Sequence, residues 1–183
     1  MRILAISGSL RAASANTALL QAAALLAPDG VRVEFYDGIG SLPHFNPDAD
    51  LEPALPAVAR WREALRSADA VLLSSPEYVH GVPGSLKNAL DWIVSSGEFS
   101  GKPLALINTS RSSFVEPQLR EILTTMEARI VPEASITLQL RSNRVSASEI
   151  AANAGAAGAL RAAVAALVAG ARSSTRPRPS FAS

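Results

Sequence analysis

The sequence contains no cysteine and only two histidines among its 183 residues. It therefore has no disulfide, no thiolate nucleophile and no cysteine-ligated metal site, and no metal site is expected. Any redox chemistry has to be carried by a bound cofactor. An excess of one charge is also lacking, because 17 Lys and Arg residues balance 16 Asp and Glu residues and leave a net charge of +1. This balance gives no chain-wide attraction for nucleic acid or a membrane surface, so neither is expected as a partner.

Long apolar runs are scarce as well. The apolar run at residues 3–6 is much too short for a signal peptide or a membrane span. The Ala-rich stretch 147–171 is long enough to span a membrane, but Glu149, Asn153 and Arg161 interrupt it. We therefore expect a cytoplasmic protein.

Short aliphatic runs alternate with stretches of helical period, which is typical of repeated βαβ units around a parallel sheet. Strands are expected at 3–6, 31–36, 70–73 and 104–107 and within 130–140, and the last helix begins at the Ser146–Glu149 capping box. The pattern predicts one domain over residues 1–171, and the aperiodic segment 172–183 is expected to be a flexible tail. We expect an α/β flavodoxin-like three-layer sandwich with five helices and a five-stranded parallel sheet of order 2-1-3-4-5.

The segment from Ser7 to Asn16 follows the first predicted strand and leads into a helix. In a parallel sheet this turn lies at the carboxyl edge, where exposed N–H groups at a helix start bind phosphate. Ser9, Ser14 and Asn16 offer neutral donors and Arg11 a charged one. The alternative is that Ser14 only caps the helix and Arg11 is a solvated loop residue. No G-x-G-x-x-G follows this strand and no G-x-S-x-G elbow occurs, which argues against a Rossmann dinucleotide site and a serine hydrolase.

The segment 74–92 follows the central predicted strand and reads SSPEYVHGVPGSLKNALDW. It places a proline, an aromatic ring and a histidine at the mouth of the same crevice, just before a helix start. Such a set suits a flat ligand such as a flavin, which needs an apolar face and positive potential beside it.

These two segments closely resemble the NADPH-dependent FMN reductase family, whose signatures are approximately G-S-x-R-x-x-S-x-N and S-P-E-Y-N-x-x-x-P-G-x-L-K-N-A-x-D-W. Val79 stands where the family usually has Asn, and the loop after the fourth strand, with Thr109, Ser110 and Arg111, is not glycine-rich. The resemblance implies that the first segment holds the FMN phosphate and the second lines the isoalloxazine. The cofactor-binding residues expected on this basis are Ser9, Arg11, Ser14, Ala15, Asn16, Pro76, Glu77, Tyr78, Val79, His80, Thr109, Ser110 and Arg111.

Some of these residues have simpler interpretations. His80 contacts flavin or substrate, or is a turn histidine satisfied by the backbone, and Arg111 faces the NADPH phosphate, the FMN edge or water. No side chain is expected to act as a catalytic acid or base, because the flavin carries the chemistry.

The resemblance implies an FMN-dependent NAD(P)H oxidoreductase with a ping-pong cycle. NADPH gives a hydride to FMN, and a small-molecule acceptor such as a quinone, azo compound, metal oxyanion or flavin then takes the electrons. A homodimer or homotetramer is expected from the same resemblance. One alternative is a flavodoxin-type electron carrier that does not react with NADPH, although such carriers are usually strongly acidic and this chain is nearly neutral. A flavin-free scaffold protein with the same fold is the other.

Overall fold

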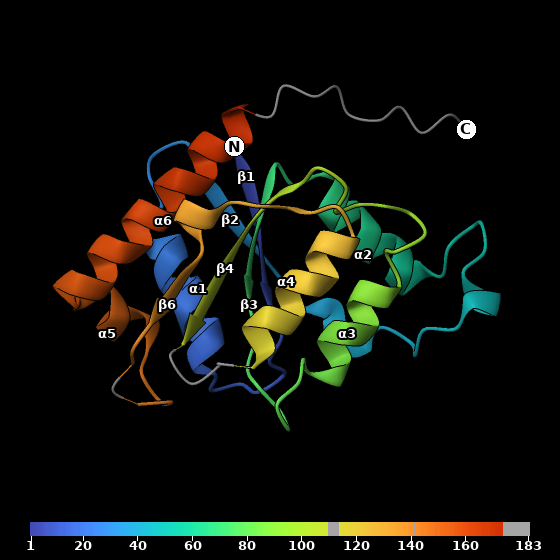
Figure 1. The fold of residues 1–183 in the computed structure, drawn as a ribbon, viewed down its shortest axis with the longest axis horizontal. Helices are drawn as coiled ribbons and strands as arrows, with labels where there is room; N and C mark the ends of the chain where they lie inside the picture. Colours follow the sequence, from blue (N-terminus) through green and yellow to red (C-terminus); the bar gives the residue numbers. More distant parts are fainter. Residues whose placement is uncertain (110–113, 141, 174–183) are drawn as a thin grey trace.

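A parallel β-sheet runs through the middle of the molecule, with helices on both faces (Figure 1). The computed structural model describes residues 1–109, 114–140 and 142–173. Neighbouring strands follow the order β2-β1-β3-β4-β5, and β6 also pairs with β4. The predicted order 2-1-3-4-5 is therefore confirmed. The strands are β1 (Arg2–Ser7), β2 (Arg32–Tyr36), β3 (Ala70–Ser74), β4 (Pro103–Thr109), β5 (Arg129–Ile130) and β6 (Ile136–Leu138).

The fifth predicted strand is divided in two, so the sheet has six strands in the described part of the chain. β5 pairs with the start of β4, at Pro103 and Leu104, whereas β6 pairs with its end, from Ile107 to Thr109. A 3-10 turn, Pro132–Ala134, separates the two segments. Because Pro132 has no N–H group to donate to a ladder, one continuous strand is not formed here.

Both faces of the central strands are buried, as the continuous apolar runs predict. On one face, Ile3 and Leu72 contact α1 (Ala15–Leu25), α5 (Ala147–Ala152) and α6 (Ala154–Ser173) in a single hydrophobic cluster. On the other face, Leu4 and Leu73 belong to a cluster with α2 (Pro56–Arg66), α3 (Gly84–Asp91) and α4 (Val115–Thr125). Figure 1 shows these two groups of helices on opposite sides of the sheet. Two further 3-10 turns span Gly38–Ser41 and Pro47–Ala49.

The Ala-rich C-terminal stretch forms two helices where one was predicted. Asn153 ends α5 with an extended backbone (ψ 114°), and its side-chain oxygen accepts a 3.0 Å hydrogen bond from the backbone N–H of Ala156 in α6. Asn favours this capping arrangement over a helix interior, because its side chain competes for backbone donors. The prediction of five helices was therefore wrong, since the described residues form six α-helices.

Helix α6 is long and apolar enough to cross a membrane, by length and composition alone. The inner face of α6 packs against the sheet, where Leu160, Val164 and Leu167 are fully buried. A core helix passes the same test, so α6 carries no argument for a membrane span.

Candidate functional site

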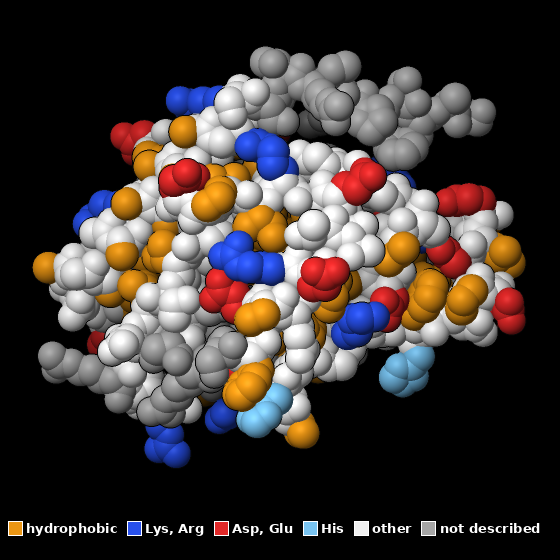
Figure 2. Space-filling view, viewed as in Figure 1, with side chains coloured by type: hydrophobic (Ala, Val, Ile, Leu, Met, Phe, Trp, Pro, Cys, Tyr) orange, Lys and Arg blue, Asp and Glu red, His pale blue; other side chains and the backbone are white. Residues whose placement is uncertain are grey.

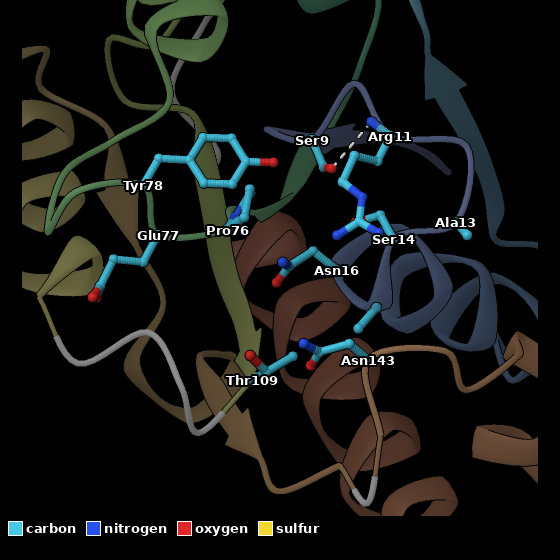
Figure 3. Close-up of a pocket in the computed structure, with 11 residues that line it drawn as sticks. Ser9, Arg11, Ala13, Ser14, Asn16, Pro76, Glu77, Tyr78, Thr109 and Asn143 are labelled. Carbon is cyan, nitrogen blue, oxygen red and sulfur yellow. Dashed lines mark hydrogen bonds between the residues drawn. The ribbon is translucent and has the colours of Figure 1, made fainter.

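An open pocket of about 250 Å³ lies at the carboxyl edge of the sheet, where β1, β3 and β4 end (Figure 3). The segments after these strands converge there because parallel strands all present their carboxyl ends at one edge. The lining residues come from the loops after β1, β3 and β6, from the first turn of α1 and from the end of β4. They are Ser9, Arg11, Ala13, Ser14, Ala15, Asn16, Pro76, Glu77, Tyr78, Thr109 and Asn143.

Gly8 allows the turn after β1 to lie tightly against β3. Its backbone N–H donates a 2.7 Å hydrogen bond to the carbonyl oxygen of Ser74. A Cβ atom at Gly8 would come within 2.9 Å of both the Leu86 Cδ2 and the Ser75 Oγ atoms. Only a residue without a side chain fits this approach, and it brings residues 9–14 around the pocket.

The start of α1 forms one wall of the pocket. Ser14 is the N-cap, and its Oγ accepts a 3.4 Å hydrogen bond from the backbone N–H of Thr17. The expected capping role of Ser14 is therefore present, but its hydroxyl proton remains available because the oxygen acts as an acceptor. The first N–H groups of a helix, here those of Ala15 and Asn16, have no partner within the helix. This helix start can thus bind an anion.

Ser9 has a similar arrangement on the other side of the mouth. Its Oγ accepts a 3.3 Å hydrogen bond from the backbone N–H of Arg11, so its proton also remains available. Arg11 is an exposed loop residue, and in Figure 3 its guanidinium group lies between Ser9 and Ser14. Arg11 and Glu77 are the charged residues among those that line the pocket in the described part of the chain.

Asn16 links the helix start to the central strand. Its side chain is almost fully buried, and its amide oxygen accepts a 3.0 Å hydrogen bond from the hydroxyl group of Ser74. Because the oxygen is committed to Ser74, the amide NH₂ is the group that Asn16 offers to a ligand. Figure 3 shows this side chain directed into the space between Ser14 and Thr109.

Pro76 and Tyr78 form the opposite wall, but the carboxylate of Glu77 points away from the pocket (Figure 3). Its Oε2 accepts hydrogen bonds from the backbone N–H groups of Phe114, at 2.8 Å, and of Val115, at 3.3 Å. Glu77 therefore caps the N-terminus of α4, where a negative charge is favourable. The part of Glu77 nearest a ligand is its backbone.

Two predicted residues of this segment, Val79 and His80, are not among the residues that line the pocket. The side chain of Val79 is fully exposed, and the ring of His80 stacks on Phe114 at a centroid distance of 4.0 Å. Thr109 lines the pocket as predicted, whereas Ser110 and Arg111 lie outside the described residues.

Two residues that line the pocket, Ala13 and Asn143, are not among those predicted from the sequence. Ala13 lies within the first motif but carries no polar group that marks it. Asn143 comes from the loop between β6 and α5. Asn143 could be predicted from the rule that loops after parallel strands share one edge of the sheet, because this rule applies to β6 as well as to β1, β3 and β4.

The first 141 residues match the family model of NADPH-dependent FMN reductases. The chain belongs to this family. An NAD(P)H-dependent FMN reductase of Pseudomonas aeruginosa is 38% identical over 149 residues, which is 78% of this chain and 80% of the relative. The quinone reductase of Escherichia coli K12 is 31% identical over 153 residues, covering 79% of this chain and 81% of the relative.

Solved structures agree with this assignment. The flavoenzyme NAD(P)H:(acceptor) oxidoreductase FerB from Paracoccus denitrificans has a TM-score of 0.72 and 26% identity, covering 94% of this chain and 97% of FerB. The flavodoxin-like fold and the family resemblance are both confirmed. The protein is thus an NAD(P)H-dependent oxidoreductase of the FMN reductase family, with FMN and NADPH as its cofactors.

The donor set of the pocket fits FMN. Hydroxyl groups, an amide, a guanidinium group and a helix start converge at one end, which suits a phosphate. A tyrosine ring and a proline lie at the other, which suits a flat ring system.

Proposed function

We propose that FMN binds in this pocket and that the protein passes reducing equivalents from NADPH to a quinone-type small molecule in two separate half-reactions. The observation that supports this most is that the anion-binding start of α1 and the Pro76–Tyr78 wall line the same pocket. When bound, FMN supplies the hydride-accepting and hydride-donating chemistry. The protein residues bind, orient and shield it.

The phosphate of FMN is proposed to lie against the start of α1. Ser9, Ser14 and the amide NH₂ of Asn16 donate hydrogen bonds to it, and Arg11 adds a charged donor from the loop. Hydrogen bonds to a charged group contribute about 1.5 to 3 kcal/mol each. This end of the pocket therefore supplies most of the binding energy that is specific to FMN over riboflavin.

The ring system is proposed to lie against Pro76 and Tyr78, with Thr109 beside it. Reduction increases the negative charge on the ring, so a carboxylate facing it would oppose the reaction. Glu77 avoids this conflict because its carboxylate is committed to the backbone N–H groups of Phe114 and Val115. The sequence next to the ring can thus contain an acidic residue without placing its charge there.

An open pocket leaves space for NADPH and then for the acceptor at the same face, which supports alternating use of one site. The acceptor class is inferred from the name of the Escherichia coli relative, a quinone reductase, and a planar molecule suits a pocket walled by Tyr78. Since NADPH is an intracellular reductant, we place this activity in the cytoplasm.

A homodimer is proposed to cover the mouth of the pocket. Tyr78, in the wall of the pocket, and Phe114, directly before α4, are 47% and 49% exposed. At the lower edge of the molecule, Figure 2 shows a histidine flanked by hydrophobic side chains. Contiguous exposed apolar groups of this kind favour a protein–protein contact. Light scattering coupled to size-exclusion chromatography tests the assembly, and a monomer at all concentrations would contradict it.

The activity itself is tested by spectroscopy of the purified protein under anaerobic conditions. Reconstitution with FMN is expected to give a yellow protein, and NADPH is expected to bleach the flavin absorbance before any acceptor is added. A quinone should then restore it. A yellow protein that NADPH does not bleach would instead be an electron carrier, and a protein that never binds FMN would be a flavin-free relative. Parallel addition of NADH measures the nucleotide preference.

A further inference from the structure

The turn from Tyr78 to Gly81, between β3 and α3, has an unfavourable backbone conformation. Its two central residues, Val79 and His80, have positive φ angles of 50° and 57°. The flanking backbone groups pair in both directions, from Tyr78 N–H to Gly81 O at 3.1 Å and from Gly81 N–H to Tyr78 O at 2.9 Å. This is the φ pattern of a type I′ turn, which strongly favours Asn and Gly at its centre.

Val79 is a poor residue for such a turn. A β-branched residue at positive φ is strained, because its Cβ substituents approach the backbone carbonyl. Its side chain is fully exposed, so no burial offsets the strain. A conformation of this kind persists only where the surrounding structure holds it.

Gln118 in α4 holds the turn from both sides of Gly81. Its Nε2 donates a 2.8 Å hydrogen bond to the carbonyl oxygen of His80, and its Oε1 accepts a 3.3 Å hydrogen bond from the backbone N–H of Val82. The two bonds run in opposite directions, so one side-chain amide satisfies a donor and an acceptor of the backbone.

Helix α4 is a rigid support for this interaction. Leu119 and Leu123 are fully buried in the hydrophobic core, and Glu77 caps the first turn of the helix. The ring of Phe114, directly before α4, stacks on His80 with an interplanar angle of 19°. Gln118 therefore joins the turn to an element whose own position is fixed.

We infer that Gln118 is a positioning residue that holds the Tyr78–Gly81 turn in its left-handed conformation and thereby keeps Tyr78 at the wall of the pocket. This inference rests on the proposed function, because the consequence for the ligand is the orientation of a ring that contacts FMN. Gln118 itself is not among the residues that line the pocket.

The first test measures FMN affinity by fluorescence titration for four variants: Gln118→Ala, Gln118→Glu, Val79→Asn, and Gln118→Ala combined with Val79→Asn. Without its support the turn relaxes, and binding has to restore the strained Val79 conformation. Gln118→Ala is then expected to weaken FMN binding by about fivefold to thirtyfold. This factor corresponds to the free-energy cost of placing one residue other than glycine in the left-handed backbone region. Gln118→Glu is expected to weaken FMN binding as well, because its carboxylate oxygen faces the carbonyl oxygen of His80.

Val79→Asn alone is expected to change FMN affinity little, but to recover most of the loss in the double variant.

The second test measures the free energy of unfolding in urea for the same variants without flavin. Val79→Asn is expected to raise the free energy of unfolding more when Gln118 is present than in the Gln118→Ala variant. When Gln118 is present, Val79 is held in the strained turn and its replacement relieves the strain. In the Gln118→Ala variant the turn has already relaxed. Equal effects of Val79→Asn in both backgrounds, or no rescue of FMN affinity, would overturn the inference. This second test still applies if the wild-type protein binds no FMN, a result that would refute only the proposed function.

Glu121→Ala provides the matched control, since Glu121 is an exposed residue one turn further along α4. It is expected to show neither the loss of FMN affinity nor any dependence on Val79. If it behaved like Gln118→Ala, the effect would come from α4 in general, and the positioning role of Gln118 would be wrong.

Discussion

The hydroxyl group of Ser74, the last residue of β3, donates a 3.0 Å hydrogen bond to the amide oxygen of Asn16 in the first turn of α1. Both side chains are buried, and the bond connects residues 58 positions apart in the sequence. It fixes the anion-binding start of α1 relative to the central strand. The amide group that faces the ligand is thus oriented by the core of the protein.

Asn16→Ala is expected to lower the free energy of unfolding by about 1 to 3 kcal/mol, because it leaves the buried Ser74 hydroxyl group without its acceptor. It should also weaken FMN binding through loss of the amide NH₂. Urea unfolding of Asn16→Ala, Ser74→Ala and the double variant measures the coupling. The double variant should cost less than the sum of the two single changes. Strictly additive effects would show that the two side chains are not coupled.

Gly8→Ala is expected to be destabilising and to weaken FMN binding. The new Cβ would meet the side chains of Leu86 and Ser75 at 2.9 Å, and forced overpacking of this kind costs about 1 to 3 kcal/mol. Gly158→Ala is the matched control, since Gly158 lies within α6 and, apart from its chain neighbours and the adjoining helix backbone, no atom lies within 4 Å of its Cβ position. That change should stabilise the protein by about 0.5 to 1 kcal/mol. A Gly8→Ala protein as stable as the wild type would refute the tight approach to β3.

Much of the fold follows from the pattern of the sequence. In β1, Ile3 and Leu4 point into opposite hydrophobic clusters, and the same alternation recurs in β3 and β4. Strands buried on both faces are typical of a parallel sheet between two helical layers. The errors occurred where one residue interrupts an otherwise favourable run. Pro132 divides the last strand and Asn153 divides the last helix, both through backbone hydrogen bonding that hydrophobicity does not report.

The site was predictable where function depends on local motifs, and less so where it depends on long-range contacts. The phosphate-binding segment is continuous in sequence, so Ser9, Arg11 and Ser14 were found together. The carboxylate of Glu77 turns toward α4 because of backbone donors 37 and 38 residues away. Asn143 reaches the pocket from a loop whose only signal is its place after a parallel strand.

Arg11→Ala is expected to weaken FMN binding by about 1.5 to 3 kcal/mol, the contribution of hydrogen bonds to a charged group. Riboflavin, which lacks the phosphate, should bind the wild-type and variant proteins equally. Arg161→Ala is the control, because Arg161 is exposed on α6 and does not line the pocket. Fluorescence titrations with both flavins provide the measurement. An equal loss for riboflavin and FMN would place Arg11 away from the phosphate.

Asp50 is expected to make the stability of the protein depend on pH. The hydrogen bond from Ser95, together with the hydrogen bond and charge of Arg62, lowers the pKa of Asp50 below its ordinary value of 3.8, against the opposing effect of burial. A carboxyl group with a lowered pKa in the folded state stabilises the fold at pH values above 3.8, and this contribution is lost as the pH falls further.

Asp50→Asn should therefore be less stable than the wild type at pH 7. The difference should shrink as the pH falls from about 5 to about 3, because protonated Asp50 resembles Asn. Urea unfolding at several pH values gives the comparison. Asp29→Asn, the same substitution at an exposed loop position, serves as the control. A difference between wild type and Asp50→Asn that stays constant down to about pH 3 would contradict the proposed linkage.

Substitutions of Glu77 test whether its carboxylate caps α4 or faces the flavin. Glu77→Ala removes the acceptor for the backbone N–H groups of Phe114 and Val115, and loss of such a cap costs about 1 kcal/mol. Glu77→Gln keeps an acceptor and should be less destabilising. Because the carboxylate points away from the pocket, Glu77→Gln should leave the midpoint potential of bound FMN unchanged, as measured by anaerobic redox titration. A clear rise in this potential without any loss of stability would mean that the charge of Glu77 acts on the ring and not on α4.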